Sequence, residues 1–243
     1  HWTPNAKIFV PSNPDKSGIN MWSESLAPNL KWAVKATYKN PLLTKRFLKN
    51  LFEKFKSLQV KFQLSGCNSI KLYFEDESRF GLLTILRRMI TAKGVKPIAP
   101  FLHRFDNLYL FGAFSPITGD SCILEMPHCN TDTFQLFLDH LSNQNPAEFK
   151  VLILDNRAFH HGARLKIPYN IALIFLPPYS LELKKKKKMW RYFKDRVSMI
   201  AYNPLELLQK KLTEITNLIN PQLIKSICGN QFYKETFRCS FNI

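Results

Sequence analysis

The sequence predicts an α/β fold: a mixed β-sheet flanked by helices, with a basic helical N-terminal segment and a helical C-terminal tail. The main observation is an unbroken apolar run at residues 151–154 that leads into Asp155 and Asn156, which is typical of a strand buried on both faces of a sheet. A second buried strand is expected at residues 171–176, where two prolines end a similar run. Segments with helical periodicity precede the first of these strands and follow the second.

A meander of strands precedes this central strand. Its first strand alternates over residues 70–74 and is expected to end in the acidic cluster Glu75-Asp76-Glu77. The other expected elements are strands at residues 82–90, 107–114 and 121–126, a helix capped by Asn130, a short helix at residues 160–166, and helices through residues 189–193 and from Pro204. A meander followed by helix, strand, helix, strand and helix is the topology of a ribonuclease-H-like domain.

We expect three parts in the chain. Residues 1–66 combine loop with a basic amphipathic helix that begins near Thr44, residues 67–200 form the sheet domain, and residues 201–243 form the helical tail. With 243 residues, 45% of them hydrophobic, the chain can fill a large core. Its five cysteines include no CxxC pair, so they indicate neither a zinc ribbon nor a disulfide framework and favour a reducing compartment.

The charge of the chain indicates a polyanionic partner. Lysine and arginine outnumber aspartate and glutamate by 35 to 18, which gives a formal charge of +17, more than solubility requires. Nucleic acid is the first candidate, and an anionic membrane surface is the alternative. We expect no membrane partner, because the sequence offers no transmembrane-length apolar stretch and no signal peptide.

Two basic stretches supply the candidate DNA-binding residues. One is the amphipathic helix near Thr44, and the other is the lysine run that precedes a tryptophan. Most charged helix faces are only solvated, and that alternative stays open here. The candidates are Lys45, Arg46, Lys49, Lys184, Lys185, Lys186, Lys188 and Trp190.

Two aspartates are the candidate metal ligands. In a ribonuclease-H-like sheet the first strand lies beside the strand that ends at Asp155, so Asp76 and Asp155 would end on neighbouring strands. Two hard cations about 4 Å apart can activate a water or a 3′ hydroxyl and stabilise the leaving oxygen of a phosphodiester. Oxygen ligands are the type that Mg²⁺ and Mn²⁺ prefer. The alternative without chemistry is that Asp155 and Asn156 cap the following helix.

Three motifs around these acids occur in a fixed order. They are Phe74-Glu75-Asp76-Glu77-Ser78-Arg79-Phe80-Gly81, then Leu154-Asp155-Asn156 followed by Phe159-His160, then Leu176-Pro177-Pro178-Tyr179-Ser180 with Glu182-Leu183 and Trp190. The ordered set resembles the bacterial insertion-sequence transposases related to mariner elements, which belong to the DDE superfamily of endonucleases. The resemblance covers roughly residues 44–218.

The resemblance implies a metal-dependent transposase that cuts DNA at element ends and joins the freed 3′ ends to a target, in DNA transposition, integration and recombination. It implies double-stranded DNA as partner and two Mg²⁺ or Mn²⁺ ions as cofactors, and it is compatible with a homodimer. The implied location is the bacterial cytoplasm, with the nucleoid. The helix-turn-helix that such enzymes carry has no clear match in the N-terminal residues.

The resemblance also assigns positions in the site. Asp76 matches the first catalytic acid and Asp155 the second, whereas Lys187 stands at the third position, which is a glutamate in the family. Glu182 is a candidate substitute, although it precedes the expected helix, and Arg157 replaces a residue that is usually small. At an effective dielectric of ~20, two unit charges ~5 Å apart interact by roughly 3 kcal/mol, so a lysine beside a divalent ion lowers metal affinity strongly.

Three functions therefore stay open. The chain is an active transposase of the DDE type, a catalytically inactive DNA-binding remnant of one, or another ribonuclease-H-like nuclease such as a resolvase, which the proline-proline-tyrosine-serine motif disfavours.

The net charge predicts an affinity for duplex DNA that is largely independent of sequence and sensitive to salt. Each phosphate neutralised by a cation should contribute about −0.9 to the slope of log K against log salt concentration. Fluorescence anisotropy with labelled duplex DNA at several salt concentrations measures this slope. Binding that stays unchanged when salt is raised severalfold would contradict the electrostatic interpretation.

Overall fold

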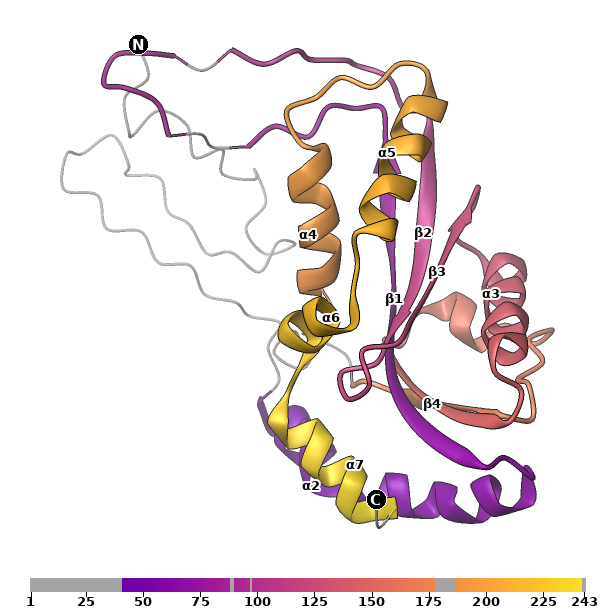
Figure 1. The fold of residues 1–243 in the computed structure, drawn as a ribbon. Helices are drawn as coiled ribbons and strands as arrows, with labels where there is room; N and C mark the ends of the chain where they lie inside the picture. The colour runs from indigo at the N-terminus through magenta and orange to yellow at the C-terminus, as the bar shows by residue number, and fades with distance from the viewer. Residues whose placement is uncertain (1–40, 88–89, 97, 178–186, 242–243) are drawn as a thin grey trace.

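The computed structural model describes residues 41–87, 90–96, 98–177 and 187–241. Its centre is a five-stranded sheet in the order β3-β2-β1-β4-β5 (Figure 1). The strands are β1 (Ser69–Gly81), β2 (Asn107–Phe114), β3 (Ser121–Met126), β4 (Glu148–Leu154) and β5 (Ile171–Phe175). β1 is antiparallel to β2 and parallel to β4, so the sheet is mixed and has the ribonuclease-H-like strand order that the sequence predicts.

Helices cover both faces of this sheet. They are α2 (Pro41–Leu64), α3 (Thr131–Gln144), the 3₁₀ helix η1 (Ala158–His161), α4 (Lys187–Val197), α5 (Leu205–Asn217), α6 (Pro221–Cys228) and α7 (Gln231–Phe241). α3 packs on one face, and α2, α4, α5, α6 and α7 pack on the other (Figure 1). In the described part of the chain, no helix is both long and apolar enough to cross a membrane.

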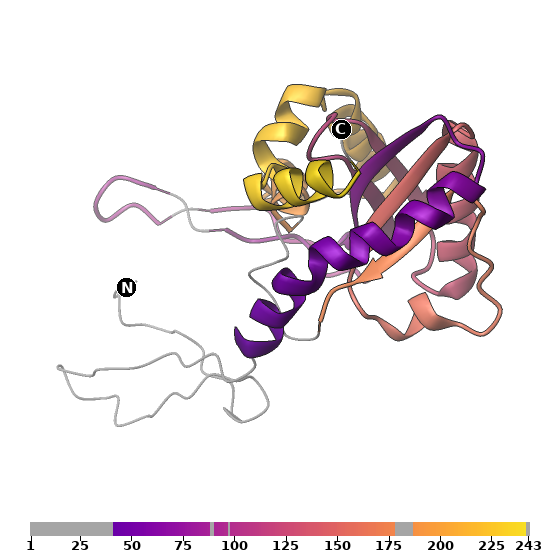
Figure 2. The same cartoon turned by 90° about the horizontal axis from the view of Figure 1, so that it is seen from below.

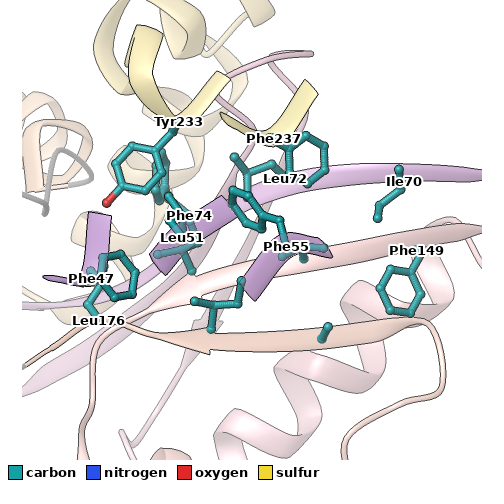
Figure 3. Packing of buried hydrophobic residues seen from close by; sticks show 14 residues of the cluster. Phe47, Leu51, Phe55, Ile70, Leu72, Phe74, Phe149, Leu176, Tyr233 and Phe237 are labelled. Atoms are coloured by element: carbon teal, nitrogen blue, oxygen red, sulfur yellow. The ribbon is translucent and has the colours of Figure 1, made fainter. Parts of the chain in front are cut away.

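The first and last helices of the described chain share one core with the sheet. α2 and α7 lie side by side, although they are far apart in the sequence (Figures 1 and 2). The Phe55 and Phe237 rings meet edge to face with centroids 5.2 Å apart, and Phe74 of β1 meets Tyr233 in the same way at 5.1 Å (Figure 3). The division of the chain at residues 66 and 200 stays a prediction, but these helices bury their apolar faces against the sheet.

β1 is longer than the sequence indicates. The prediction that it ends in the acidic cluster is wrong, because the strand continues to Gly81. Residues 69–74 pair with β4, and residues 74–81 pair with β2. The second partner satisfies the backbone of β1 after β4 has ended, so the three acidic residues lie inside a strand.

The strand that the sequence predicts at residues 82–90 does not form in the described residues 82–87 and 90. The Leu82 and Thr84 N–H groups still donate to the Asp106 and Leu102 carbonyls, at 3.0 and 3.2 Å. Beyond them the segment leaves the sheet and extends away from it (Figures 1 and 2). The short helix predicted at residues 160–166 is also wrong in extent, since only η1 forms there.

Phe55→Ala should lower the free energy of unfolding by about 3–5 kcal/mol, because it leaves a cavity where a fully buried ring packs against Phe237. Val60 lies on the same helix and is 62% exposed, so Val60→Ala is the matched control and should change stability by less than about 0.5 kcal/mol. Urea denaturation followed by circular dichroism measures both. Equal effects of the two changes would show that α2 is not part of the core.

Candidate active site

The alternation of β1 sends the acids of its central cluster to opposite faces of the sheet. Asp76 pairs with Gly112 of β2, and a Cβ on Gly112 would lie 2.9 Å from the Trp190 ring of α4. Side chains of paired residues share a face, so Asp76 lies on the α4 face. Glu75 and Glu77 lie on the α3 face, because their partners in β2 belong to the core cluster that packs against α3.

Asp155 follows β4 directly, as the sequence predicts. Phe74 and Ile153 are register partners of β1 and β4, and both belong to the core cluster on the face that α2 and α7 cover. Asp76 and Asp155 each stand two residues further along. Alternation, continued one residue past the end of β4, predicts both aspartates on the face of Phe74 and Ile153, which is also the face of α4. The Asp155 carboxylate lies at the end of the strand and also reaches His160, with Oδ1 3.6 Å from Nδ1. Both aspartates are buried, with 4% and 7% of their surface exposed.

Arg157 joins acids that come from the two strands. Its Nη1 lies 2.9 Å from Glu77 Oε1, and its Nε lies 3.3 Å from Asp155 Oδ2. Burial opposes the charge of the guanidinium, but the carboxylates of Glu77, Asp155 and Asp76 outweigh burial and raise the pKa of Arg157. The side chain of Arg157 is 47% exposed, whereas those of Asp155 and Glu77 are 9% and 1% exposed, so the guanidinium stands between these two acids and solvent.

The His160 ring lies close to Asp155, Glu75 and Glu77. Its Nδ1 is 2.9 Å from the Asp155 carbonyl oxygen, which can only accept, so Nδ1–H donates this hydrogen bond. Its Nε2 then faces Glu75 Oε2 and Glu77 Oε1, each 3.9 Å away. The described residues bring these three together as possible cation ligands, with one atom of each within 4.8 Å of the others. The ring packs against Phe134 of α3, with centroids 4.5 Å apart.

Sequence reasoning did not place Glu75, Glu77 and His160 in one cluster. Alternation predicts that residues 75 and 77 share a face, which is the available signal for the two glutamates. The position of His160 depends on the η1 turn after Asp155, which the sequence pattern predicted as a longer helix.

The residue that the resemblance assigns to the third acid position lies at the start of α4. Lys187 is the first residue of this helix, whose first turn has no acidic residue. Lys188 is exposed. The remaining residues predicted for this region, Glu182, Lys184, Lys185 and Lys186, lie outside the described residues, and their roles stay predictions.

Trp190 is buried and does not lie on the surface, where a residue that contacts DNA must lie. It is 4% exposed and belongs to the core cluster of α4, with ring centroids 5.6 Å from Phe114 and 5.5 Å from Phe193. The physical reason is that Gly112 has no side chain on the α4 face of the sheet, and the Trp190 ring fills the space that this leaves. Its predicted DNA contact is therefore corrected to a packing role, whereas Lys45, Arg46 and Lys49 are exposed on α2.

Comparison with known proteins gives a family match for residues 71–212, to the family described as DDE superfamily endonuclease. One relative, the uncharacterized protein y4pE/y4sA of Sinorhizobium fredii, is 38% identical over 88 residues, which are 36% of this chain and 65% of the relative. The pre-cleavage Mos1 transpososome is similar in structure, with a TM-score of 0.55, 12% identity, and coverage of 90% of this chain and 69% of that one. The mariner Mos1 paired-end complex with Mg gives a TM-score of 0.52, 11% identity and coverage of 89% and 66%.

These comparisons differ in what they establish. At 11–12% identity the Mos1 structures share the fold with this chain, in agreement with the ribonuclease-H-like sheet. The match of residues 71–212 extends from β1 into α5 and includes both aspartates. The chain spans 65% of the length of the Sinorhizobium fredii relative.

Charge reversal on α2 should show that the exposed cations of this helix contribute to DNA binding and that Trp190 does not. The triple change Lys45→Glu, Arg46→Glu and Lys49→Glu should weaken binding to duplex DNA at least about tenfold at low salt, because three phosphate-attracting charges become repulsive. Trp190→Phe keeps an aromatic ring in the core and should keep DNA affinity within about twofold, since the indole does not reach the surface. Anisotropy titrations of the folded variants measure both. The reverse ranking of the two variants would return Trp190 to the DNA-binding residues.

Proposed function

This chain belongs to the DDE superfamily of endonucleases, and from that premise we propose that it is a transposase-like DNA endonuclease and strand transferase of the insertion-sequence type, whose activity in this copy is lowered because Lys187 stands at the third acid position. The observation that carries the proposal is the register of β1 and β4. Asp76 and Asp155 follow the paired residues Phe74 and Ile153 on one face of the central strands, at the point where β4 ends. Acids from two adjacent strands on one face are what two-metal phosphodiester chemistry needs.

The proposed partner is double-stranded DNA, both the transposon ends and the target. Exposed Lys45, Arg46 and Lys49 on α2, Lys188 on α4 and the net charge of +17 support an extended contact with phosphates. The Mos1 structures that share this fold include a paired-end complex with a transposon end and a strand transfer complex. From the resemblance to insertion-sequence transposases we also propose a homodimer that acts on the nucleoid in the bacterial cytoplasm.

The residues fit a divalent metal ion in part. Buried carboxylates from Asp76 and Asp155 are hard oxygen donors of the kind that Mg²⁺ and Mn²⁺ prefer, and Mos1 complexes with Mg and with Mn are known. When bound, two such ions would activate the attacking water or 3′ hydroxyl and stabilise the leaving oxygen. The chain itself would hold Asp76 in the part of β1 that pairs with β2, and fix Asp155 by the backbone hydrogen bond to His160.

A second candidate function is a catalytically inactive DNA-binding remnant of a transposase. Lys187 favours it, because the first turn of α4 carries no acidic residue where the family resemblance expects the third ligand. A remnant would retain the fold and the basic surface, and would bind DNA without cutting it.

Cleavage of DNA by matched variants decides between the two candidates. The unmodified protein should bind labelled duplex DNA that carries the ends of its own element but show little or no Mg²⁺-dependent nicking, since the second ion lacks a ligand and meets a positive charge. Lys187→Glu should restore nicking, resolved on a denaturing gel.

The control is Lys187→Glu combined with Asp155→Ala, which should bind the same DNA without cutting it. Full activity of the unmodified protein would mean that another acid, with Glu182 as the first candidate, completes the site. A Lys187→Glu variant that binds DNA but does not cut would favour the inactive remnant.

A further inference from the structure

Arg157 gives the candidate site a cation of its own. The guanidinium contacts Asp155 through Nε at 3.3 Å and Glu77 through Nη1 at 2.9 Å. Because Asp155 follows β4 and Glu77 lies in β1, the two contacts cross between neighbouring strands. Both acids are almost fully buried, so these contacts are made in surroundings where a charge interaction is stronger than in water.

Buried carboxylates need a compensating positive charge. Leaving one buried without a partner is strongly unfavourable, by several kcal/mol in typical cases. His160 also lies near Asp155, with Nδ1 2.9 Å from the backbone carbonyl oxygen and 3.6 Å from Oδ1, but an imidazole carries a charge only when it is protonated. Arg157 offers Asp155 a permanent charge, and the Asp155 oxygen that it contacts is chemically one that a divalent ion would also use.

We propose that Arg157 competes with a divalent ion for Asp155 and so sets the metal affinity of the site. The inference rests on the proposed function, because it takes Asp155 as a metal ligand. A guanidinium and a divalent ion repel one another, so they cannot share one carboxylate at these distances without loss of affinity. The half-exposed Arg157 side chain can turn toward solvent, and a metal ion must displace it from Asp155 before it binds there.

The structure also contains a second group of residues that could bind the ion in place of Asp155. Loss of Arg157 exposes Glu77 as well as Asp155, and Glu77 is one of the three possible cation ligands in the cluster with Glu75 and His160 on the α3 face. Metal bound there would not be held by Asp155. The two destinations differ in the carboxylate that they need, so variants of Asp155 and Glu77 separate them.

The test is Mn²⁺ binding measured by isothermal titration calorimetry on full-length protein without DNA. Arg157→Ala and Arg157→Gln should each bind Mn²⁺ at least about tenfold more tightly than the unmodified protein, whereas Arg157→Lys, which keeps the charge, should show a smaller gain. Arg157→Gln serves if the alanine variant does not fold. The matched control is Arg87→Ala, which removes a half-buried ion pair with Asp195 elsewhere in the structure and should leave Mn²⁺ affinity unchanged.

A second substitution, added to Arg157→Ala, identifies the carboxylate that binds the ion. Arg157→Ala with Asp155→Asn should lose the gain, and Arg157→Ala with Glu77→Gln should keep it. A gain that survives Asp155→Asn but is lost with Glu77→Gln would put the ion in the Glu75, Glu77 and His160 cluster and overturn the proposal. Equal affinity of Arg157→Ala and the unmodified protein would also overturn it.

Lys187→Glu separates this inference from the proposed function. If Lys187→Glu binds Mn²⁺ and adding Arg157→Ala does not tighten binding, Arg157 is not a competitor and the proposed function stands. If neither Lys187→Glu nor the double variant binds Mn²⁺, the site does not take a metal ion and both proposals fail. Tighter binding by the double variant than by Lys187→Glu alone supports both.

Discussion

The arrangement of the site depends on the alternation of side chains along β1. Successive residues of a strand point to opposite faces, so the run Glu75-Asp76-Glu77 cannot act as one acidic cluster. Asp76 lies with α4, and the two glutamates lie with α3 and His160. The strand can carry three acids at its centre because β2 continues to pair with it after β4 has ended. β4 ends at Leu154, so Asp155 follows next to the part of β1 that carries the three acids.

Much of this arrangement could be predicted from the sequence, because it follows from local patterns. The apolar run before Asp155 predicts β4, and the strand and helix order predicts the sheet topology that the structure has. The extent of β1 could not be predicted, since it depends on pairing with β2, which lies 26 residues or more further along the chain. Residues 82–90 are rich in apolar residues, but in the described part of this segment the Leu82 and Thr84 N–H groups bond to the chain that leads into β2 and no strand forms, so composition alone misleads there.

The misassigned site residues have the same origin. Trp190 follows a lysine run and resembles a surface residue in the sequence, but Gly112, far away in the chain, leaves room for its ring. Arg157 and His160 are three residues apart, and the η1 turn directs both toward acids of β1. No periodic pattern in the sequence predicts either contact, because each depends on how a loop crosses to the neighbouring strand. Interactions of this kind are fixed by tertiary structure and not by local pattern.

Arg157 has opposite consequences for metal and for DNA. The guanidinium contacts both Asp155 and Glu77, so its charge disfavours a divalent ion at these carboxylates. The same side chain is half exposed, and a guanidinium is well suited to bind the oxygens of a phosphate. On the proposed function, such a charge lowers affinity for the ions that cutting requires and raises affinity for the DNA backbone, so metal binding and DNA binding need not be lost together.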